Sequence, residues 1–155
     1  PVKSSNNLID FMHRYEMVKI QVKDNNNLLA SDIELNLKRP NYTINSLRYI
    51  SKAYPNNSFS LIIGEDNFVN FKKWREYKEI MNYYKIYVYP RKTRLKTNMK
   101  LIMSNNIEMI EAPLIDLSST NIRNIINDKD YAKQFISDSV YKYITTNNLY
   151  KSNKL

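Results

Sequence analysis

The side chains best suited to chemistry in this sequence are three hydroxyls followed by an arginine. Ser118, Ser119 and Thr120 stand at the start of an expected helix, and Arg123 follows one turn later. The first N–H groups of a helix have no partner within it and carry partial positive charge, so this position favours an anion. The guanidinium of Arg123 can add a two-pronged contact to a phosphate. The residues alone leave open an ordinary Ser/Thr cap with a solvated arginine.

The only glycine of the chain, Gly64, is the second candidate. It follows an apolar run at residues 59–63 that is typical of a buried parallel strand, and Glu65, Asp66 and Asn67 come next. A glycine here can turn the backbone with positive φ or let a ligand approach the main chain. Ligands of open α/β sheets bind beyond the carboxyl ends of the strands. An ordinary strand-to-loop turn is the alternative, but the chain uses asparagine in its other turns, which favours a functional reason.

Trp74 and His13 are each the only residue of their type. Trp74 can serve as a stacking platform beside the strand-end loop or simply fill the core. His13 can act as a general base, but a surface or boundary position is the better interpretation because no second histidine or cysteine exists to work with it. The lack of cysteine excludes disulfides, thiolate catalysis and cysteine-ligated metals, and together with the single histidine it argues against a structural zinc site.

The elements that must position these groups alternate between helix and strand patterns. Apolar residues three or four apart predict helices over 8–22, 43–54, 76–84, 118–127 and 138–146. Short apolar or β-branched runs predict strands over 28–35, 59–63, 86–89 and 107–112. Phe68 and Phe71 predict one helical turn, and the basic residues 91–106 predict a loop or short helix. The alternation indicates an α/β fold, a Rossmann-like parallel sheet with helices on both faces.

Caps and buried faces are predicted for individual helices. The first helix should be capped by Asn6 or Asn7 and end at the asparagine-rich turn 24–27, where Asn tolerates a left-handed backbone. Its apolar stripe is Leu8, Met12, Tyr15, Val18 and Val22. The second helix should be capped by Thr43 and bury Ile44, Leu47, Ile50 and Tyr54. In the last helix the inward residues should be Val140, Tyr143 and Ile144.

The composition is that of one globular domain. The 155 residues are 43% hydrophobic and 25% charged, which is enough for a core. No apolar run approaches a membrane span and no signal peptide is recognisable, so a cytoplasmic location is the default. The net charge of +9 suits nucleic acid, a membrane surface or phosphate-bearing small molecules. Because Lys, Asn, Ile and Tyr are abundant throughout, a general compositional bias is favoured over a nucleic-acid-binding stripe.

Three motifs follow one another along the chain: PNYTINSL at 40–47, IIGEDN at 62–67 with Lys73 and Trp74 after it, and IDLSSTNIR at 115–123. They resemble the P-S-Y-T-x-x-T-L motif, the I-I-G-x-D motif followed by K-W or T-W, and the I-S-S-T-x-I-R signature of bacterial nicotinate-nucleotide adenylyltransferases. Residues 13–18, 31–34 and 143–150 also match, so the resemblance runs almost end to end. The serine-rich motif is common to the nucleotidyltransferase superfamily, and the other two narrow the resemblance to this member.

Two features depart from the family pattern. The family's G-x-F-D-P-x-H-x-G-H motif, whose histidines grip the ATP phosphates, is absent, and residues 1–3 match the loop after the second strand. We therefore expect an N-terminally truncated nucleotidyltransferase domain over 1–155, without the first β-α-β portion, without a catalytic residue of its own and with weak or no activity alone. His13 does not replace the motif, because Arg14 follows it. Arg75 stands where many members carry an aromatic residue.

The resemblance implies adenylyl transfer from ATP to nicotinic acid mononucleotide, which gives deamido-NAD and pyrophosphate in NAD biosynthesis. The residues implied at ATP are Gly64, Asp66, Ser118, Ser119, Thr120 and Arg123. Thr43 and Trp74 would recognise the nicotinate ring, Trp74 by stacking. Mg²⁺ would arrive with the nucleotide phosphates, with no metal site in the protein. This scheme requires Gly64 and Ser119 to face each other across a crevice that holds ATP.

Two other functions stay open at this point. One is a related nucleotidyltransferase with another acceptor, such as phosphopantetheine. The other is a basic nucleic-acid-binding module that uses residues 91–100 and the tyrosines, with an affinity that falls steeply with salt. The favoured partners are ATP and nicotinic acid mononucleotide, not nucleic acid or a membrane, and the sequence leaves room for a homo-oligomer.

Overall fold

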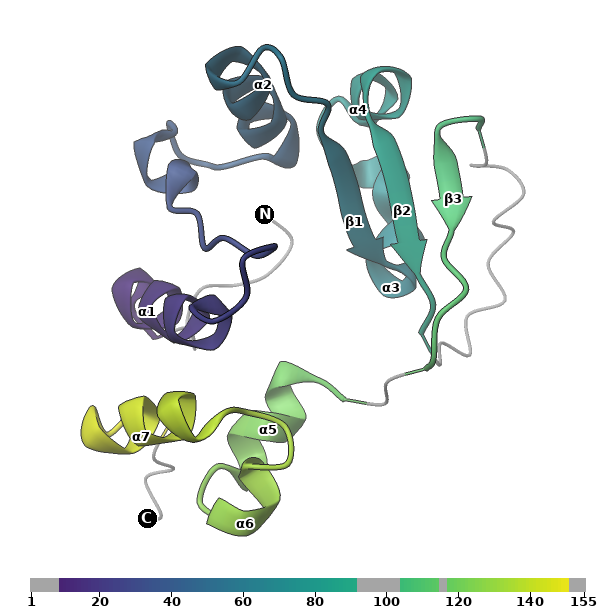
Figure 1. Ribbon diagram of the computed structural model, residues 1–155. Helices are drawn as coiled ribbons and strands as arrows, with labels where there is room; N and C mark the ends of the chain where they lie inside the picture. Colours follow the sequence, from purple (N-terminus) through teal and green to yellow (C-terminus); the bar gives the residue numbers. More distant parts are fainter. Residues whose placement is uncertain (1–8, 92–103, 115–116, 151–155) are drawn as a thin grey trace. The chain divides into compact units, whose positions relative to one another are not determined.

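The computed structural model describes residues 9–91, 104–114 and 117–150 (Figure 1). These residues form two compact units. The described residues of 36–114 make up the first unit, and those of 9–35 and 117–150 make up the second. Each unit has a hydrophobic core of its own.

A three-stranded parallel sheet organises the first unit. Its strands are β1 (Ser60–Gly64), β2 (Lys85–Tyr89) and β3 (Ile107–Met109), in the order β1-β2-β3. Gly64 lies opposite Tyr89 in the register of β1 and β2, so both strands present their carboxyl ends at the same edge of the sheet (Figure 1). The parallel α/β arrangement expected from the sequence is thereby confirmed, while the covering of both faces by helices stays a prediction.

One helix before β1 and three short helices between β1 and β2 supply the rest of this core. They are α2 (Thr43–Ala53), α3 (Glu65–Phe68), the 3₁₀ helix η2 (Phe71–Lys73) and α4 (Tyr77–Tyr83). Phe68, Phe71 and Ile80 are fully buried against the strands, and Ile44 and Leu47 bring α2 into the same cluster. In place of the single helical turn predicted from Phe68 and Phe71, two short helices form, and α4 forms within the helix predicted over 76–84.

One face of β1 is open in the described residues. Leu61 and Ile63 pack into the core, whereas Ile62 between them is 69% exposed. The sequence predicted a fully buried strand at 59–63, and this was wrong for Ile62. Successive side chains of a strand point to opposite faces, and only the face with Leu61 and Ile63 meets the helices.

The second unit is helical. It contains α1 (Phe11–Val22), α5 (Ser119–Ile125), α6 (Lys129–Ala132) and α7 (Asp138–Thr146). Its buried core consists of Ile126, Ala132, Val140 and Ile144. The sequence correctly predicted the last helix with Val140 and Ile144 inward, and the helix after Ser118, but it missed α6.

The N-terminal helix differs from its prediction in both cap and face. Asp10 caps α1, because its carboxylate accepts the Met12 N–H at 2.8 Å, so the cap is not Asn6 or Asn7. Met12 and Val18 of the predicted stripe are about half exposed, at 52% and 49%, whereas Met17 and Ile20 pack into the core. The face of α1 that packs in this unit therefore includes Met17 and Ile20, which lie outside the predicted stripe.

Residues 28–35 do not form the predicted strand. Ile33–Asn36 is a 3₁₀ helix, η1, in which the Leu35 N–H donates to the Asp32 carbonyl oxygen at 2.8 Å. Leu29 is 91% exposed. No strand of the described residues pairs with this segment, so its apolar alternation is not part of a sheet.

Several helix ends also differ from the predictions. Thr43 is the first residue of α2 and not its cap, which is Tyr42 without a side-chain bond, and Tyr54 after the helix is 58% exposed. The left-handed backbone predicted for the asparagines at 24–27 occurs instead at Asn148, with φ 54°. Asn25 closes the earlier turn through its side-chain oxygen, which accepts the Asn27 N–H at 2.9 Å.

The remaining strand and loop predictions are settled in part. β2 agrees with its prediction, and β3 ends at Met109, three residues before the predicted end, although the Ile110 N–H still donates to the Val88 carbonyl oxygen at 2.9 Å. Residues 92–103 of the predicted basic loop lie outside the described residues. Within the described residues, no helix combines the length and apolar character that crossing a bilayer requires.

Candidate functional site

Gly64, the single glycine of the chain, lies at the carboxyl end of β1. Gly64 has φ −72° and ψ 150°, so the positive φ considered from the sequence is not the reason for it. A Cβ at this position would lie under 3.0 Å from Asp66 Oδ1, which is closer than real side chains approach. Gly64 thus leaves room for the Asp66 carboxylate to fold back against the strand end, and a larger residue here would have to displace that side chain.

Arg91 joins the two carboxylates at this edge. Its backbone N–H donates to Glu65 Oε2 at 3.0 Å, and its Nε lies 3.9 Å from Asp66 Oδ1. Arg91 comes just after β2, and the parallel register brings the ends of β1 and β2 together. Arg91 was not among the residues expected at ATP and was considered only as the first residue of the basic stretch 91–100. Arg91 follows a predicted strand by two residues, and ligands of open sheets bind at the edge where such strands end. This position is the sequence feature that could have identified Arg91.

The two residues expected at a pyridine ring both belong to the first unit. Thr43 is half-buried at the start of α2. Trp74 follows η2, is half-buried, and packs on Phe71 with ring centroids 5.4 Å apart. Trp74 thus packs against the core and is only partly buried, so core filling and stacking both stay open for it.

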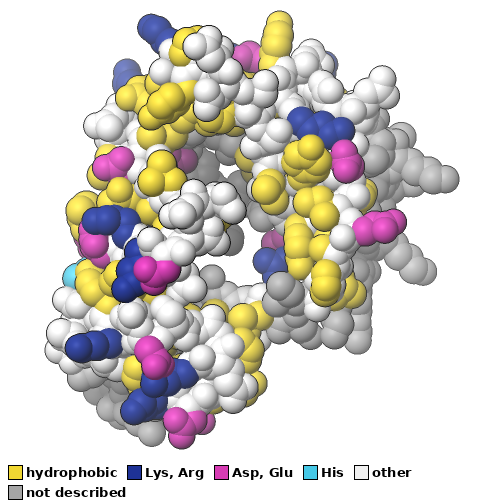
Figure 2. Space-filling view, in the orientation of Figure 1, with side chains coloured by type: hydrophobic (Ala, Val, Ile, Leu, Met, Phe, Trp, Pro, Cys, Tyr) yellow, Lys and Arg dark blue, Asp and Glu magenta, His cyan; other side chains and the backbone are white. Residues whose placement is uncertain are grey.

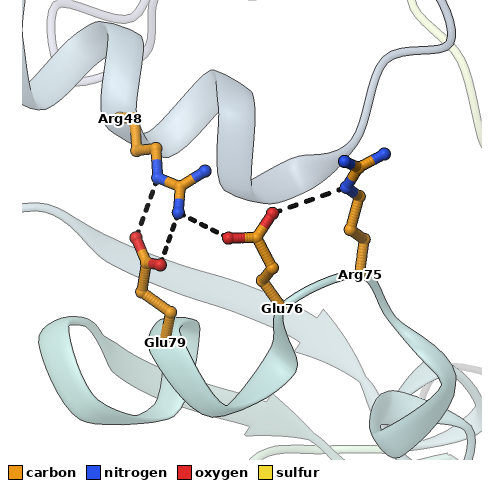
Figure 3. Close-up of polar contacts among 4 residues, drawn as sticks. All are labelled: Arg48, Arg75, Glu76 and Glu79. Atoms are coloured by element: carbon orange, nitrogen blue, oxygen red, sulfur yellow. Dashed lines mark hydrogen bonds and ion pairs between the residues drawn. The ribbon is translucent and has the colours of Figure 1, made fainter.

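Arg75, the residue after Trp74, belongs to a chain of ion pairs formed by four charged side chains (Figure 3). Arg48 Nε donates to Glu79 Oε1 at 2.8 Å, and Arg48 Nη2 also contacts Glu79 Oε2. The same Nη2 donates to Glu76 Oε2 at 2.6 Å, and Arg75 Nε reaches Glu76 Oε1 at 3.4 Å. The hydrogen bond from Arg48 is the main reason why the pKa of Glu76 is lowered from its ordinary value. The contacts of Arg48 join residues about 30 positions apart, so no local sequence pattern predicts them.

Arg75 also lies over an aromatic ring. The carbon at the centre of its guanidinium is 4.9 Å from the centroid of the Tyr42 ring. Tyr42 immediately precedes Thr43, and Arg75 immediately follows Trp74. The departure from the family pattern noted in the sequence therefore has a definite structural partner.

In the second unit, the hydroxyl-rich start of α5 forms as predicted. Ser118 caps the helix: its Oγ accepts the Asn121 N–H at 3.1 Å and donates to Asn121 Oδ1. Thr120 Oγ1 accepts a hydrogen bond from Arg123 Nη2 at 3.1 Å. Ser119 is exposed, and its hydroxyl has no partner among the described residues. The predicted set therefore divides into a structural cap, a hydroxyl–guanidinium pair and one available hydroxyl.

Arg123 is held by an aromatic side chain as well. Its guanidinium lies 6.0 Å from the centroid of the Tyr150 ring. Burial raises the pKa of the Tyr150 phenol, and the charges of Arg123 and Arg14 oppose this shift. At neutral pH the phenol is neutral, so it orients the guanidinium without cancelling its charge.

His13 takes the boundary position that the sequence favoured. Its Nδ1 lies 2.9 Å from the Tyr143 hydroxyl, and the two rings meet edge to face with centroids 5.9 Å apart. This contact links α1 to α7 within the second unit. His13 has the role of a packing residue here.

The sequence-predicted site residues are thus divided between the two units. Gly64 and Asp66 lie together at the strand end, and Thr43 and Trp74 belong to the same unit. Ser118, Ser119, Thr120 and Arg123 lie together in the other unit. The expectation that Gly64 and Ser119 face each other across a crevice stays a prediction.

The described residues show no concentration of positive charge on the face drawn in Figure 2, and residues 92–100 of the stretch considered for nucleic acid lie outside the described residues. On the face drawn in Figure 2, Lys and Arg side chains are scattered and interspersed with Asp and Glu side chains. Among the described residues, no three His, Asp or Glu side chains are grouped as metal ligands. The polar groups of interest are those at the strand end, beside Trp74 and at the start of α5.

Comparison with known proteins defines the class first. The sequence model of the cytidylyltransferase-like family matches residues 1–125, a range that includes the parallel sheet and all of α5. A solved structure of the Plasmodium falciparum nicotinic acid mononucleotide adenylyltransferase complexed with APC has the same fold, with a TM-score of 0.74 at 21% identity. The match covers 92% of this chain and 77% of that one. The same Plasmodium protein complexed with NaAD gives a TM-score of 0.73 at 18% identity, over 96% and 78% of the two chains.

Sequence similarity then narrows the class. A Flavobacterium johnsoniae protein described as a probable nicotinate-nucleotide adenylyltransferase is 39% identical over 151 residues, which is 97% of this chain and 78% of that protein. The chain belongs to the nicotinate-nucleotide adenylyltransferases of the cytidylyltransferase-like family.

Proposed function

We propose that the residues described above serve adenylyl transfer from ATP to nicotinic acid mononucleotide in three groups: the strand end, the ring-binding pair and the start of α5. The activity is that of a nicotinate-nucleotide adenylyltransferase, an enzyme of NAD biosynthesis. The observation that carries the proposal is the 39% identity over 97% of the chain, together with the three motifs in their expected order.

The first group holds the nucleotide at the carboxyl edge of the sheet. Gly64 lets the Asp66 carboxylate lie against the strand end, where it can accept hydrogen bonds from a ribose hydroxyl. Parallel sheets bind ligands at this edge. Asp66 would orient the nucleotide, because a carboxylate accepts hydrogen bonds from the ribose hydroxyls and repels the negatively charged phosphates.

The start of α5 would bind the triphosphate. The Ser119 hydroxyl and the Arg123 guanidinium are the groups best placed to donate to phosphate oxygens, with Thr120 holding Arg123 at 3.1 Å. Ser118 contributes by fixing the first turn through its bonds with Asn121. Because Ser118 caps the helix and Ser119 would bind phosphate, substitution of the two serines should have different effects on stability and on binding.

Thr43 and Trp74 would recognise the pyridine ring. Trp74 is held by Phe71 and by the core, so its exposed face is a rigid surface for stacking. Thr43 would donate its hydroxyl to the ring substituent. Thr43 is the first residue of α2, which precedes β1, and Trp74 directly follows η2, which lies between β1 and β2.

The chemical step needs no protein nucleophile. A phosphate oxygen of the mononucleotide attacks the α-phosphorus of ATP, and the bond from that phosphorus to the bridging oxygen of the β-phosphate breaks as pyrophosphate leaves. The protein contributes orientation of the two substrates and positive charge for the developing negative charge. In this chain Arg123 supplies such a charge.

A divalent metal would bind at this site through the phosphates of the nucleotide and not through a set of protein ligands. Glu65 and Asp66 at the strand end both contact Arg91, and no three-residue ligand cluster exists among the described residues. Mg²⁺ commonly binds nucleotide phosphates with few protein ligands. When bound in that way it would neutralise phosphate charge.

The proposal is tested by replacing Arg123 with alanine. We expect a KM for ATP that is raised about tenfold or more, or a lowered kcat, and the same loss in direct titration with a non-hydrolysable ATP analogue. Lys142→Ala is the matched control, because it removes one positive charge from an exposed position on α7. Unchanged ATP affinity and kinetics in Arg123→Ala would remove Arg123 from the site.

A further inference from the structure

Arg75 is the chain neighbour of one residue of the proposed ring-binding pair and contacts the chain neighbour of the other. It follows Trp74 in the chain, and its guanidinium lies 4.9 Å from the centroid of Tyr42, the residue before Thr43. A guanidinium over a ring face is held by electrostatic attraction and by stacking. The Arg75 guanidinium is thus held in a restricted orientation over Tyr42, beside Thr43 in the chain.

The ion-pair chain holds Arg75 without using up its hydrogen-bonding capacity (Figure 3). Only the Nε of Arg75 faces Glu76, at 3.4 Å, and its terminal nitrogens have no carboxylate partner among the described residues. Glu76 makes its shorter contact, 2.6 Å, with Arg48, which also binds Glu79. The negative charge of Glu76 is therefore shared between two arginines, and Arg75 keeps much of its positive charge.

The exposed fraction of Arg75 is consistent with a role in binding. Its side chain is 58% exposed, whereas its partner Glu76 is 39% exposed. A ligand can reach the terminal nitrogens, and the stem is anchored by Tyr42. The two terminal nitrogens form a fork that matches the two oxygens of a carboxylate.

We propose that Arg75 is a specificity-determining residue that selects a pyridine ring with a carboxylate over one with a carboxamide. The inference rests on the proposed function, in which Thr43 and Trp74 hold the ring. The two substituents have nearly the same shape, so size cannot separate them. A carboxylate offers only acceptors to the guanidinium, whereas a carboxamide turns N–H donors or a neutral oxygen toward it.

Trp74 provides the measurement, because it is the only tryptophan of the chain. Titration with nicotinic acid mononucleotide and, separately, with nicotinamide mononucleotide should quench its fluorescence if the ring stacks on it. Both ligands carry the same ribose phosphate, so the ratio of their dissociation constants reports on the ring substituent. This readout does not depend on turnover.

We expect the wild-type protein to bind the acid more tightly than the amide. Arg75→Gln should reduce this ratio about tenfold, mainly by weakening the acid, which is the size of one lost hydrogen bond to a charged group. Arg75→Lys should keep part of the preference because it keeps the charge without the fork. Lys78→Gln, which removes an exposed charge from α4, should leave the ratio unchanged.

The outcomes separate the inference from the proposed function. Quenching by both ligands with an unchanged ratio in Arg75→Gln, or with no preference in the wild type, would overturn the role of Arg75 and leave the stacking role of Trp74 intact. An equal loss in Lys78→Gln would show that only net charge matters and would also overturn it. No response of the wild type to either ligand would contradict the ring-binding pair itself, and the inference with it.

Discussion

Gly64→Ala tests the reason why the strand end carries a glycine. The new Cβ would meet Asp66 Oδ1 at under 3.0 Å and would lie 3.6 Å from Arg91 Nε. The backbone itself should accept alanine, because φ −72° and ψ 150° are allowed for any residue. The substitution therefore acts on the Asp66 carboxylate, which has to move away from the strand.

Two opposing effects determine the stability of this variant. Alanine restricts the unfolded chain and stabilises the fold by about 0.4–1 kcal/mol. Forcing Asp66 out of its position costs about 0.5–1.5 kcal/mol if the side chain leaves its preferred rotamer. The free energy of unfolding should therefore change by no more than about 1 kcal/mol, a shift of roughly 2–4 °C in Tm.

The affinity for ATP should change much more than the stability. If Asp66 hydrogen-bonds the ribose, its displacement removes a bond to a charged group, worth about 1.5–3 kcal/mol. This corresponds to a roughly 10- to 150-fold increase in Kd. Calorimetric titration with a non-hydrolysable ATP analogue measures the affinity, and thermal unfolding measures the stability of the same samples.

A double-mutant cycle provides the control. In an Asp66→Ala background the added Cβ has no carboxylate to displace, so Gly64→Ala should then have little further effect on ATP affinity. An equal loss of affinity in both backgrounds would refute the explanation through Asp66. A loss of stability above about 3 kcal/mol would instead point to backbone strain or core damage, which the geometry at Gly64 does not predict.

The neighbouring serines and the ion-pair chain give further predictions. Ser118→Ala should lower the free energy of unfolding by about 1 kcal/mol through loss of the cap, whereas Ser119→Ala should leave thermal unfolding unchanged and weaken binding of the ATP analogue; a reversed pattern would contradict the roles assigned to them. Because the pKa of Glu76 is lowered from 4.5 in the folded protein, its contribution to stability should be complete above that pH and be lost as the pH falls below it. In Arg48→Gln this acid-dependent loss should shrink, as measured by urea unfolding at neutral and acidic pH, and an unaltered pH dependence would show that Arg48 is not its cause.

Much of the candidate site could be predicted from the sequence because its signals are local. The Ser118 cap needs only a hydroxyl before a helical pattern, and the structure confirms its bond to Asn121. The strand before Gly64 and the buried positions of Ile44, Leu47 and Ile80 follow from apolar spacing. The family resemblance, which depends on motif order, was confirmed by the comparisons.

Other features depended on contacts between residues far apart in the chain. Residues 28–35 have a strand-like pattern, but a strand forms only beside a partner, and no strand pairs with them among the described residues. Two faces of α1 are apolar, and packing against α7 selected the one with Met17 and Ile20. Local periodicity cannot choose between such alternatives, since the free energy that decides between them comes from burial against another element.

The sequence by itself determined the family, the order of most elements and the residue types available for phosphate and ring recognition. Tertiary structure alone decided that Gly64 makes room for a carboxylate, that Arg91 joins the strand end, and that Arg75 is held over Tyr42 within a chain of ion pairs. The physical reason is range: hydrogen bonds of caps and the spacing of apolar residues act within a few positions, whereas charge pairing and steric exclusion act between whichever groups the fold brings together.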